Sequence, residues 1–214
     1  MELRGLFVTG TDTGVGKTTF AVWLARELTA RGIRVRARKP VESGCRGDTP
    51  SDVALLQAAT GNYESRERIC PWPLAEPISP ERALLRAGLQ IGITDLSAAC
   101  LFGVEKDDFL LIEGAGGFFS PLAPGVRNAE LAVALKLPVV LIVADRLGCL
   151  NHTMLTVEAI SARQLCLHAV ILNRNNTIST PGMDNHADLE RWLNKKIYSC
   201  SLNTINDQLT DILK

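Results

Sequence analysis

Short apolar runs alternate with segments of helical periodicity along most of the chain. The first run covers residues 3–9 and precedes a glycine-rich loop; from Lys17, apolar residues recur at helical spacing until Gly32. Residues 33–38 alternate aliphatic side chains with arginines, a period of two that is typical of a strand. Three later runs are apolar almost throughout: Phe109 to Ile112, Pro138 to Ala144 and Ala169 to Leu172. Further helices are expected near Asp52 to Thr60, Pro80 to Ala87, Thr94 to Phe102, Asn128 to Leu135, Asn151 to Arg163 and Asp184 to Lys195.

This order of elements predicts the fold class. Uninterrupted apolar strands separated by helices are typical of a mostly parallel sheet with helices on both faces. We therefore expect an α/β protein in which residues 1–214 form a single domain, with residues 61–80 irregular and rich in proline. In open α/β sheets, ligands bind beyond the carboxyl ends of the strands. The residues that follow each strand are therefore the candidates for chemistry.

Composition and charge argue against several classes of function. Lys plus Arg and Asp plus Glu both total 23, so the chain lacks the basic excess of a dedicated nucleic-acid binder. The longest apolar stretch, Leu137 to Ala144, is too short to span a membrane, and no secretory signal precedes the first strand. The six cysteines form no Cys-x-x-Cys pair. We expect a soluble cytoplasmic protein with neither a nucleic acid nor a membrane as its partner.

The loop after the first strand, GTDTGVGKTT, has the residues of a phosphate-binding loop with unusual spacing. In the common pattern, G-x-x-x-x-G-K-[ST], the first glycine would occupy position 11; here that residue is Thr11, and the glycine is Gly10. Main-chain N–H groups of such a loop and of the following helix bind phosphate oxygens. Lys17 can reach the β- and γ-phosphates, and the Thr18 hydroxyl suits Mg²⁺. A strand, this loop and a helix in succession predict a P-loop-containing nucleoside triphosphate hydrolase-like fold.

The second strand is followed by KPVESG, which contains two candidate site residues. The ammonium of Lys39 could meet a phosphate or a substrate carboxylate, and Ser43 can offer a hydroxyl. A solvated lysine before a turn set by proline is the alternative interpretation.

Two carboxylates could complete a metal site. Glu113 ends an apolar strand and precedes a glycine-rich stretch that would allow the main chain to approach a ligand, whereas Asp52 begins a predicted helix. At that position Asp52 could simply complement the helix dipole. Together with Thr18, these residues form an all-oxygen set of the kind that Mg²⁺ prefers.

Three further segments have candidate roles. The segment from Asp145 to His152 precedes a helix whose first N–H groups could bind a carboxylate. Asn173 follows the fifth strand, where its amide could pair with the edge of an adenine or simply stabilise a turn. The alternating Arg34, Arg36 and Arg38 are interpreted as the solvated side of a strand near the sheet edge, in preference to a nucleic-acid strip.

Taken together, these motifs make the sequence similar to the dethiobiotin synthetases of biotin synthesis. The resemblance rests on VTGTDTGVGKT, KPVESG, AEPISP, IEGAGGFFSPL and LGCLNHTMLT, which follow the family's order and span most of residues 5 to 175. The family's phosphate loop contains the same extra residue. The resemblance implies an enzyme that uses ATP and Mg²⁺ to join CO₂ to 7,8-diaminopelargonate and to close a ureido ring, through a carbamate and a carbamic-phosphoric anhydride.

The resemblance also implies residue roles. It makes Lys17 and Lys39 the catalytic cations and assigns the metal to Thr18, Asp52 and Glu113. It implies a homodimer in which a loop of one subunit holds the substrate carboxylate bound to the other. The nucleotide contacts that it implies are Gly14, Val15, Gly16, Lys17, Thr18, Thr19, Glu113, Gly114, Ala115, Gly116 and Asn173. The substrate contacts that it implies are Thr13, Ser43, Gly148, Cys149, Leu150 and Asn151.

The main alternative is a nucleotide-switched partition or positioning ATPase on the same fold. The phosphate loops of such proteins contain a signature lysine five residues before the loop lysine. In this chain that position is Asp12, which favours the synthetase interpretation.

Overall fold

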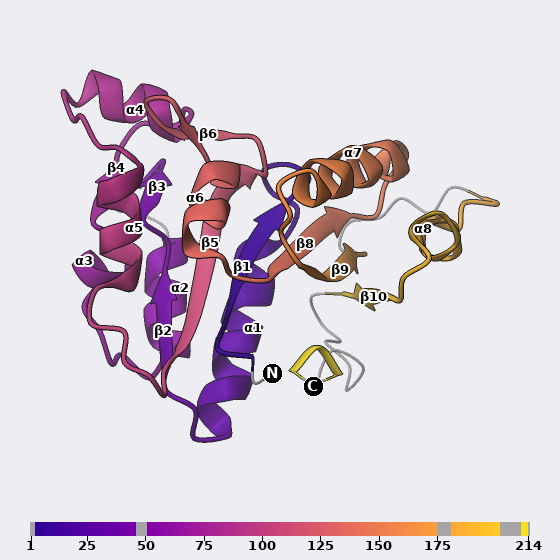
Figure 1. Cartoon of the computed structure of the whole chain (residues 1–214), viewed down its shortest axis with the longest axis horizontal. Helices are drawn as coiled ribbons and strands as arrows, with labels where there is room; N and C mark the ends of the chain where they lie inside the picture. Colours follow the sequence, from indigo (N-terminus) through magenta and orange to yellow (C-terminus); the bar gives the residue numbers. More distant parts are fainter. Residues whose placement is uncertain (1–2, 46–50, 175–180, 202–210, 214) are drawn as a thin grey trace.

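A six-stranded parallel sheet forms the centre of the computed structural model, which describes residues 3–45, 51–174, 181–201 and 211–213. The strand order is β10-β9-β8-β1-β5-β2, and every pairing within this sheet is parallel (Figure 1). The predicted mostly parallel α/β sheet is thus confirmed. Its strands are β1 (Gly5–Gly10), β2 (Val35–Arg38), β5 (Phe109–Gly117), β8 (Val139–Ala144), β9 (Leu167–Asn173) and β10 (Ile197–Cys200).

Two small strand pairs and the helices complete the described elements. β3 (Val41–Ser43) pairs in parallel with β4 (Trp72–Leu74), and β6 (Pro121–Ala123) pairs in antiparallel fashion with β7 (Val126–Arg127). The helices are α1 (Lys17–Ala30), α2 (Asp52–Ala59), α3 (Arg66–Ile69), α4 (Pro80–Arg86), α5 (Ile93–Leu101), α6 (Asn128–Leu135), α7 (Cys149–Ser161) and α8 (Asn185–Leu193). In the described part of the chain, none of these helices has the length and apolarity needed to cross a membrane.

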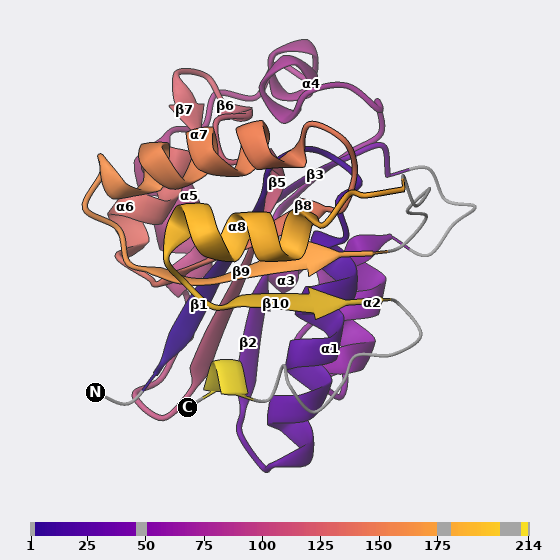
Figure 2. The same ribbon diagram turned by 90° about the vertical axis from the view of Figure 1, so that its right-hand side faces the viewer.

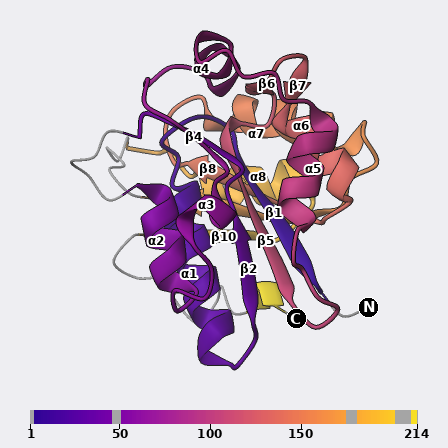
Figure 3. The ribbon, with the colours of Figure 1, turned by 90° about the vertical axis from the view of Figure 1, so that its left-hand side faces the viewer.

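Helices cover both faces of the sheet because successive side chains of a strand point to opposite faces. In β1, Leu6 and Val8 pack in the core cluster that includes α1 and α2, whereas Phe7 packs in the cluster that includes α5 and α6. Figure 3 shows α1 and α2 on one side of β2, with α5 and α6 on the other. In Figure 2, α7 and α8 lie over β8, β9 and β10, and Leu189 of α8 packs with strand residues there.

Two predictions about regular structure were wrong. Residues 61–80 are not simply irregular, because they contain α3 and β4, although proline limits both elements to a few residues. β10, a short strand at the sheet edge that pairs with β9, was not predicted from the sequence. β10 has only four residues, and in that length a strand has too few positions for its period to be distinguished from that of other structures.

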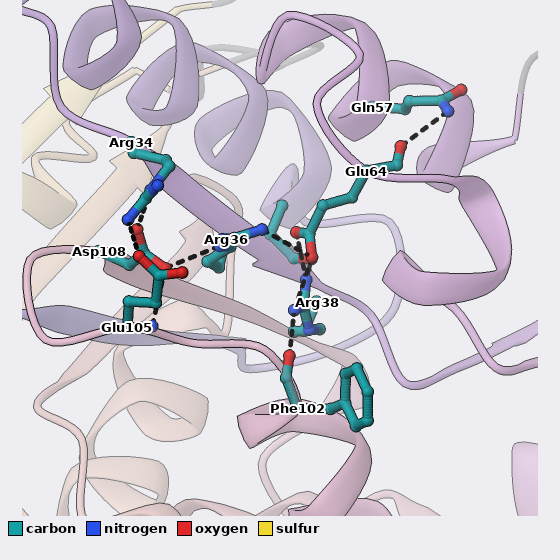
Figure 4. A network of polar contacts seen from close by, with 9 residues as sticks. Arg34, Arg36, Arg38, Gln57, Glu64, Phe102, Glu105 and Asp108 are labelled. Carbon is teal, nitrogen blue, oxygen red and sulfur yellow. Dashed lines mark hydrogen bonds and ion pairs between the residues drawn. The ribbon is translucent and has the colours of Figure 1, made fainter.

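The interpretation of the three arginines as a solvated strand face was also wrong. β2 does lie at the sheet edge, yet Arg36 and Arg38 are buried under the loops that contain Glu64 and Asp108 (Figure 4). Arg36 Nε donates to Asp108 Oδ2 at 2.7 Å, and Arg38 Nη1 donates to Glu64 Oε2 at 2.6 Å. Arg34 also contacts Asp108. The arginines therefore bind acidic loops of the same chain.

Candidate active site

The phosphate loop begins where β1 ends, and this explains its unusual spacing. Gly10 is the last residue of β1 and pairs with Gly117 of β5, so the turn itself starts at Thr11. A Cβ atom at Gly10 would lie 2.6 Å from Cγ2 of Val15, a contact that a side chain could not make. Position 10 therefore needs glycine for close packing of the strand end against the loop.

The other end of the loop is held against β9. Gly16 is the N-cap of α1 and has a φ of 102°, a left-handed conformation that favours glycine. The side-chain amide of Asn173 donates to the carbonyl of Val15 at 2.8 Å. A Cβ atom at Gly16 would lie 2.3 Å from the same amide nitrogen. Asn173 thus lies directly against the loop, and its predicted contact with the base stays a prediction.

Four predicted site residues, one of which is the buried Lys39, form a single cluster of contacts. Lys39 lies just beyond β2, and its Nζ contacts Asp52, the first residue of α2, and Glu113 of β5. The distance from Lys39 Nζ to Glu113 Oε1 is 2.7 Å. Thr18 Oγ1 donates to the same carboxylate oxygen at 2.7 Å. Burial lowers the pKa of Lys39, but the Glu113 and Asp52 carboxylates outweigh it and raise that pKa above its usual value.

The second cation, Lys17, has a different environment. Its Nζ donates to the main-chain carbonyl of Asp12 at 3.0 Å, within the phosphate loop. Burial is the largest influence and lowers the pKa of Lys17 to about 8, although Glu113 acts in the opposite direction. An anion bound in the loop would raise that pKa and favour the charged form. Lys17 is therefore suited to bind an anion such as a phosphate.

A cleft of about 390 Å³ joins these groups. Its lining contains most of the predicted site residues, but not Val15, Gly114 or Asn173. A larger hollow of about 700 Å³ is lined by Leu3, Ile33 and Phe109, near the amino ends of the strands and far from these groups. The cleft is lined by Thr13, Gly14, Gly16, Lys17, Thr18, Thr19, Lys39, Glu42, Ser43, Asp52, Glu113, Ala115 and Gly116.

Two residues of the site, Glu42 and Asn128, were not predicted from the sequence. Glu42 lines the cleft, and its Oε1 accepts a hydrogen bond from the main-chain nitrogen of Asp52 at 2.9 Å. Asn128, at the start of α6, is completely buried and holds the stretch after Glu113 by donating to the carbonyls of Ala115 and Gly117. The only signal for Glu42 was its place inside KPVESG. Asn128 is a buried partner of main-chain groups, and no residue type in the sequence indicates such a contact.

The oxygen atoms in the cleft fit a hard cation such as Mg²⁺. Thr18, Asp52 and Glu113 supply a hydroxyl and two carboxylates, and Glu113 Oε2 is buried without a hydrogen-bond partner among the described residues. Within the same described ranges, no group of three or more His, Cys, Asp or Glu side chains is arranged to hold a metal. Mg²⁺ beside a nucleotide commonly takes only one or two carboxylates, together with phosphates and water, so this set is sufficient.

The segment before α7 lies outside the cleft lining. Gly148 is the N-cap of α7 with a φ of 89°, and Cys149, Leu150 and Asn151 form the first turn of the helix. Leu147 is 85% exposed. Arg146 of this segment contacts Asp12 of the phosphate loop, with 3.1 Å between Nη2 and Oδ2. The segment is therefore tied to the phosphate loop, while the exposed Leu147 is not among the residues that line the cleft.

The fold and the cleft together define the class: an α/β protein with a phosphate loop, of the kind that binds nucleoside triphosphates. A family model described as "AAA domain" matches residues 4–205. The chain is 38% identical to the ATP-dependent dethiobiotin synthetase BioD of Anaeromyxobacter dehalogenans (strain 2CP-C), an alignment that covers 91% of this chain and 87% of the relative. It is 43% identical to the enzyme of the same name from Nitrosospira multiformis, over 80% of this chain and 76% of that one. The chain belongs to the dethiobiotin synthetase family.

Two solved structures of other proteins share the fold. A ParA family ATPase from Chlorobium tepidum TLS superposes with a TM-score of 0.57 at 16% identity, covering 99% of this chain and 88% of that chain. The MinC:MinD cell division complex of Aquifex aeolicus gives a TM-score of 0.56 at 14% identity, covering 98% of this chain and 85% of that chain. At these identities the likeness concerns the fold alone.

Proposed function

We propose that this protein converts 7,8-diaminopelargonate, CO₂ and ATP into dethiobiotin, ADP and phosphate. One amine of the diamine adds to CO₂ and loses a proton to form a carbamate. A carbamate oxygen then attacks the γ-phosphorus of ATP and releases ADP, which gives a carbamic-phosphoric anhydride. The second amine attacks the carbamoyl carbon and expels phosphate, closing the ureido ring. The observation that supports this proposal most is Lys39, a buried cation held beside the phosphate loop by Asp52 and Glu113.

Positioning and charge stabilisation supply most of the catalysis in phosphoryl transfer. We assign the triphosphate to residues 14–19, where main-chain N–H groups and Lys17 can bind its oxygens. Lys39 neutralises the carbamate and the transferred phosphoryl group, since its ammonium contacts the same Glu113 oxygen as Thr18 of the loop. Thr13 and Ser43 line the same cleft and are assigned to the substrate. Glu113, Gly114, Ala115, Gly116 and Asn173 are assigned to the nucleotide.

The metal proposed for this site is Mg²⁺, held by Thr18, Asp52 and Glu113. When bound, it supplies a positive charge that draws electron density from the phosphate oxygens. In the structure, Lys39 Nζ contacts both carboxylates. We infer that Lys39 Nζ moves from these carboxylates to the substrate oxygens when the metal is bound.

A homodimer is the proposed assembly, with the start of α7 reaching into the site of the other subunit. Gly148, Cys149, Leu150 and Asn151 would bind the substrate carboxylate at the start of α7, where the helix dipole favours a negative charge. Two facts support this: the segment lies outside the cleft lining of its own chain, and Leu147 beside it is highly exposed. We place the enzyme in the cytoplasm, where ATP is available.

A mixing experiment tests the shared site. Lys39→Met and Asn151→Leu should each abolish dethiobiotin formation, and unfolding and refolding them together should restore it. In a mixed dimer one site combines an intact Lys39 with an intact Asn151 of the other chain. If the mixture stays inactive while both proteins co-assemble, the α7 segment acts on its own subunit and the shared site is wrong.

The product assay tests the reaction itself. The purified protein should release ADP only when the diamine, bicarbonate and Mg²⁺ are present together. ATP hydrolysis at the same rate without the diamine would contradict the synthetase proposal and favour a nucleotide switch.

A further inference from the structure

Glu42 is buried in the cleft wall without any role in the reaction described so far. It is the middle residue of β3, three positions after Lys39, and it is 8% exposed. A carboxylate is costly to bury unless its oxygens are hydrogen-bonded. The partner of Glu42 therefore indicates what this residue contributes.

That partner is the main chain of Asp52. The Asp52 nitrogen donates to Glu42 Oε1 at 2.9 Å, and Asp52 is the first residue of α2. The first N–H groups of a helix have no acceptor within the helix, so a side chain from outside can satisfy one of them. Ser51, the N-cap, satisfies a different one by accepting from Ala54 at 3.2 Å. Two N–H groups at the start of α2 thus have side-chain acceptors: the N-cap Ser51 for one and Glu42 of β3 for the other.

The link to β3 determines where the Asp52 carboxylate lies. β3 follows Lys39 and Pro40 directly, so Glu42 and Lys39 belong to one short segment. Asp52 is held at both ends by that segment: its nitrogen by Glu42 and its carboxylate by Lys39. If the Glu42 bond were lost, the side-chain contact would have to hold the helix start alone.

We propose that Glu42 is a positioning residue that keeps the Asp52 carboxylate in the cleft. It acts through the Asp52 N–H and touches neither the nucleotide nor the metal. This inference rests on the proposed function, because it assumes that Asp52 serves the metal. The role depends on an acceptor oxygen at this place and not on the negative charge of Glu42. Glutamine, which retains that oxygen, should therefore replace Glu42.

Three variants separate positioning from general stability. Glu42→Ala removes the acceptor, Glu42→Gln retains it, and Ser51→Ala removes the neighbouring cap of the same helix without touching Glu42. Mn²⁺ is the probe, titrated into the whole protein with ADP present and followed by the electron paramagnetic resonance signal of free Mn²⁺. Thermal unfolding and dethiobiotin formation as a function of Mg²⁺ concentration are recorded for each variant.

The expected result is a loss of metal affinity that glutamine rescues. Glu42→Ala should raise the Mn²⁺ dissociation constant and the Mg²⁺ concentration for half-maximal rate about tenfold, which corresponds to about 1.4 kcal/mol. Its rate at saturating Mg²⁺ should stay near that of the unaltered protein. Glu42→Gln should bind Mn²⁺ like the unaltered protein. Ser51→Ala should lower the unfolding temperature but leave Mn²⁺ binding unchanged.

Three results would overturn the inference. Unchanged Mn²⁺ binding in Glu42→Ala would show that Asp52 needs no such support. Equal losses in the alanine and glutamine variants would assign the effect to charge, and an equal loss in Ser51→Ala would assign it to helix stability. A failure of the proposed function would give a different result. The unaltered protein would then form no dethiobiotin, regardless of the Mn²⁺ dissociation constants of the variants.

Discussion

Replacing Lys39 by methionine tests the central cation of the site. The variant retains an unbranched side chain of similar length but removes the ammonium that contacts Asp52 and Glu113. Glu113 is 1% exposed, so its carboxylate would lose its cationic partner without gaining water. We expect Lys39→Met to be both less stable and far less active than the unaltered protein.

The size of the stability loss follows from burial. At the Nζ to Oε1 distance of 2.7 Å, the attraction is about 6 kcal/mol for an effective dielectric constant of about 20, before desolvation is subtracted. Removing one partner of a buried ion pair costs about 3–5 kcal/mol. The Asp52 side chain is 39% exposed, so solvent screens its share of the loss. A decrease of about 3 kcal/mol in the free energy of unfolding is therefore expected for the ligand-free protein.

The loss of turnover should be larger and should have a separate cause. Removing one group that stabilises transition-state charge lowers kcat by about 10²–10³. The double variant Lys39→Met with Glu113→Gln distinguishes the two effects, because neutralising position 113 removes the unpaired charge. Urea unfolding should show that the double variant regains most of the lost stability, whereas dethiobiotin formation should stay lost. The reasoning is refuted if Lys39→Met turns over like the unaltered protein, or if Glu113→Gln restores no stability.

Two further predictions concern acid stability and the phosphate loop. Burial raises the pKa of the Asp108 carboxyl. The hydrogen bonds that Arg36 and Arg34 donate to it outweigh burial and lower that pKa below its usual value. The stability gained from the ionised form is thus present above the unfolded pKa of about 4 and is lost as the pH falls through the folded value. Asp108→Asn should flatten the fall in unfolding free energy below about pH 4, and an unchanged slope would contradict this assignment. Gly16→Ala should weaken ADP binding, measured by calorimetry, more than Gly14→Ala does. Both glycines have a positive φ, but only a Cβ atom at Gly16 would collide with Asn173. Equal losses of ADP affinity in the two variants would contradict that clash.

Much of the fold, and most of the residues that line the cleft, could be predicted from the sequence. The apolar runs identified four of the six strands of the sheet, because buried parallel strands are apolar on both faces, and the alternation of aliphatic residues with arginines identified β2. The site residues could be grouped because parallel strands end at one edge of the sheet, and this places Lys39 and Glu113 beside the loop. Their chemical roles stay predictions.

The features that were missed depend on contacts between distant segments. Arg36 and Arg38 alternate with aliphatic residues as a solvated face would, and only the folded loops show that Glu64 and Asp108 cover them. The bond from Glu42 ends on a main-chain nitrogen, and any residue except proline could provide that donor. No residue type at the partner position therefore indicates such a contact in a sequence.

Mass detection of the product tests the central claim most directly. The unaltered protein is incubated with 7,8-diaminopelargonate, ¹³C-labelled bicarbonate, ATP and Mg²⁺, and both dethiobiotin and ADP are quantified. The account predicts dethiobiotin that carries a single labelled carbon, formed in equal amount with ADP and absent when any one component is omitted. ADP release without labelled dethiobiotin from the complete mixture would contradict it.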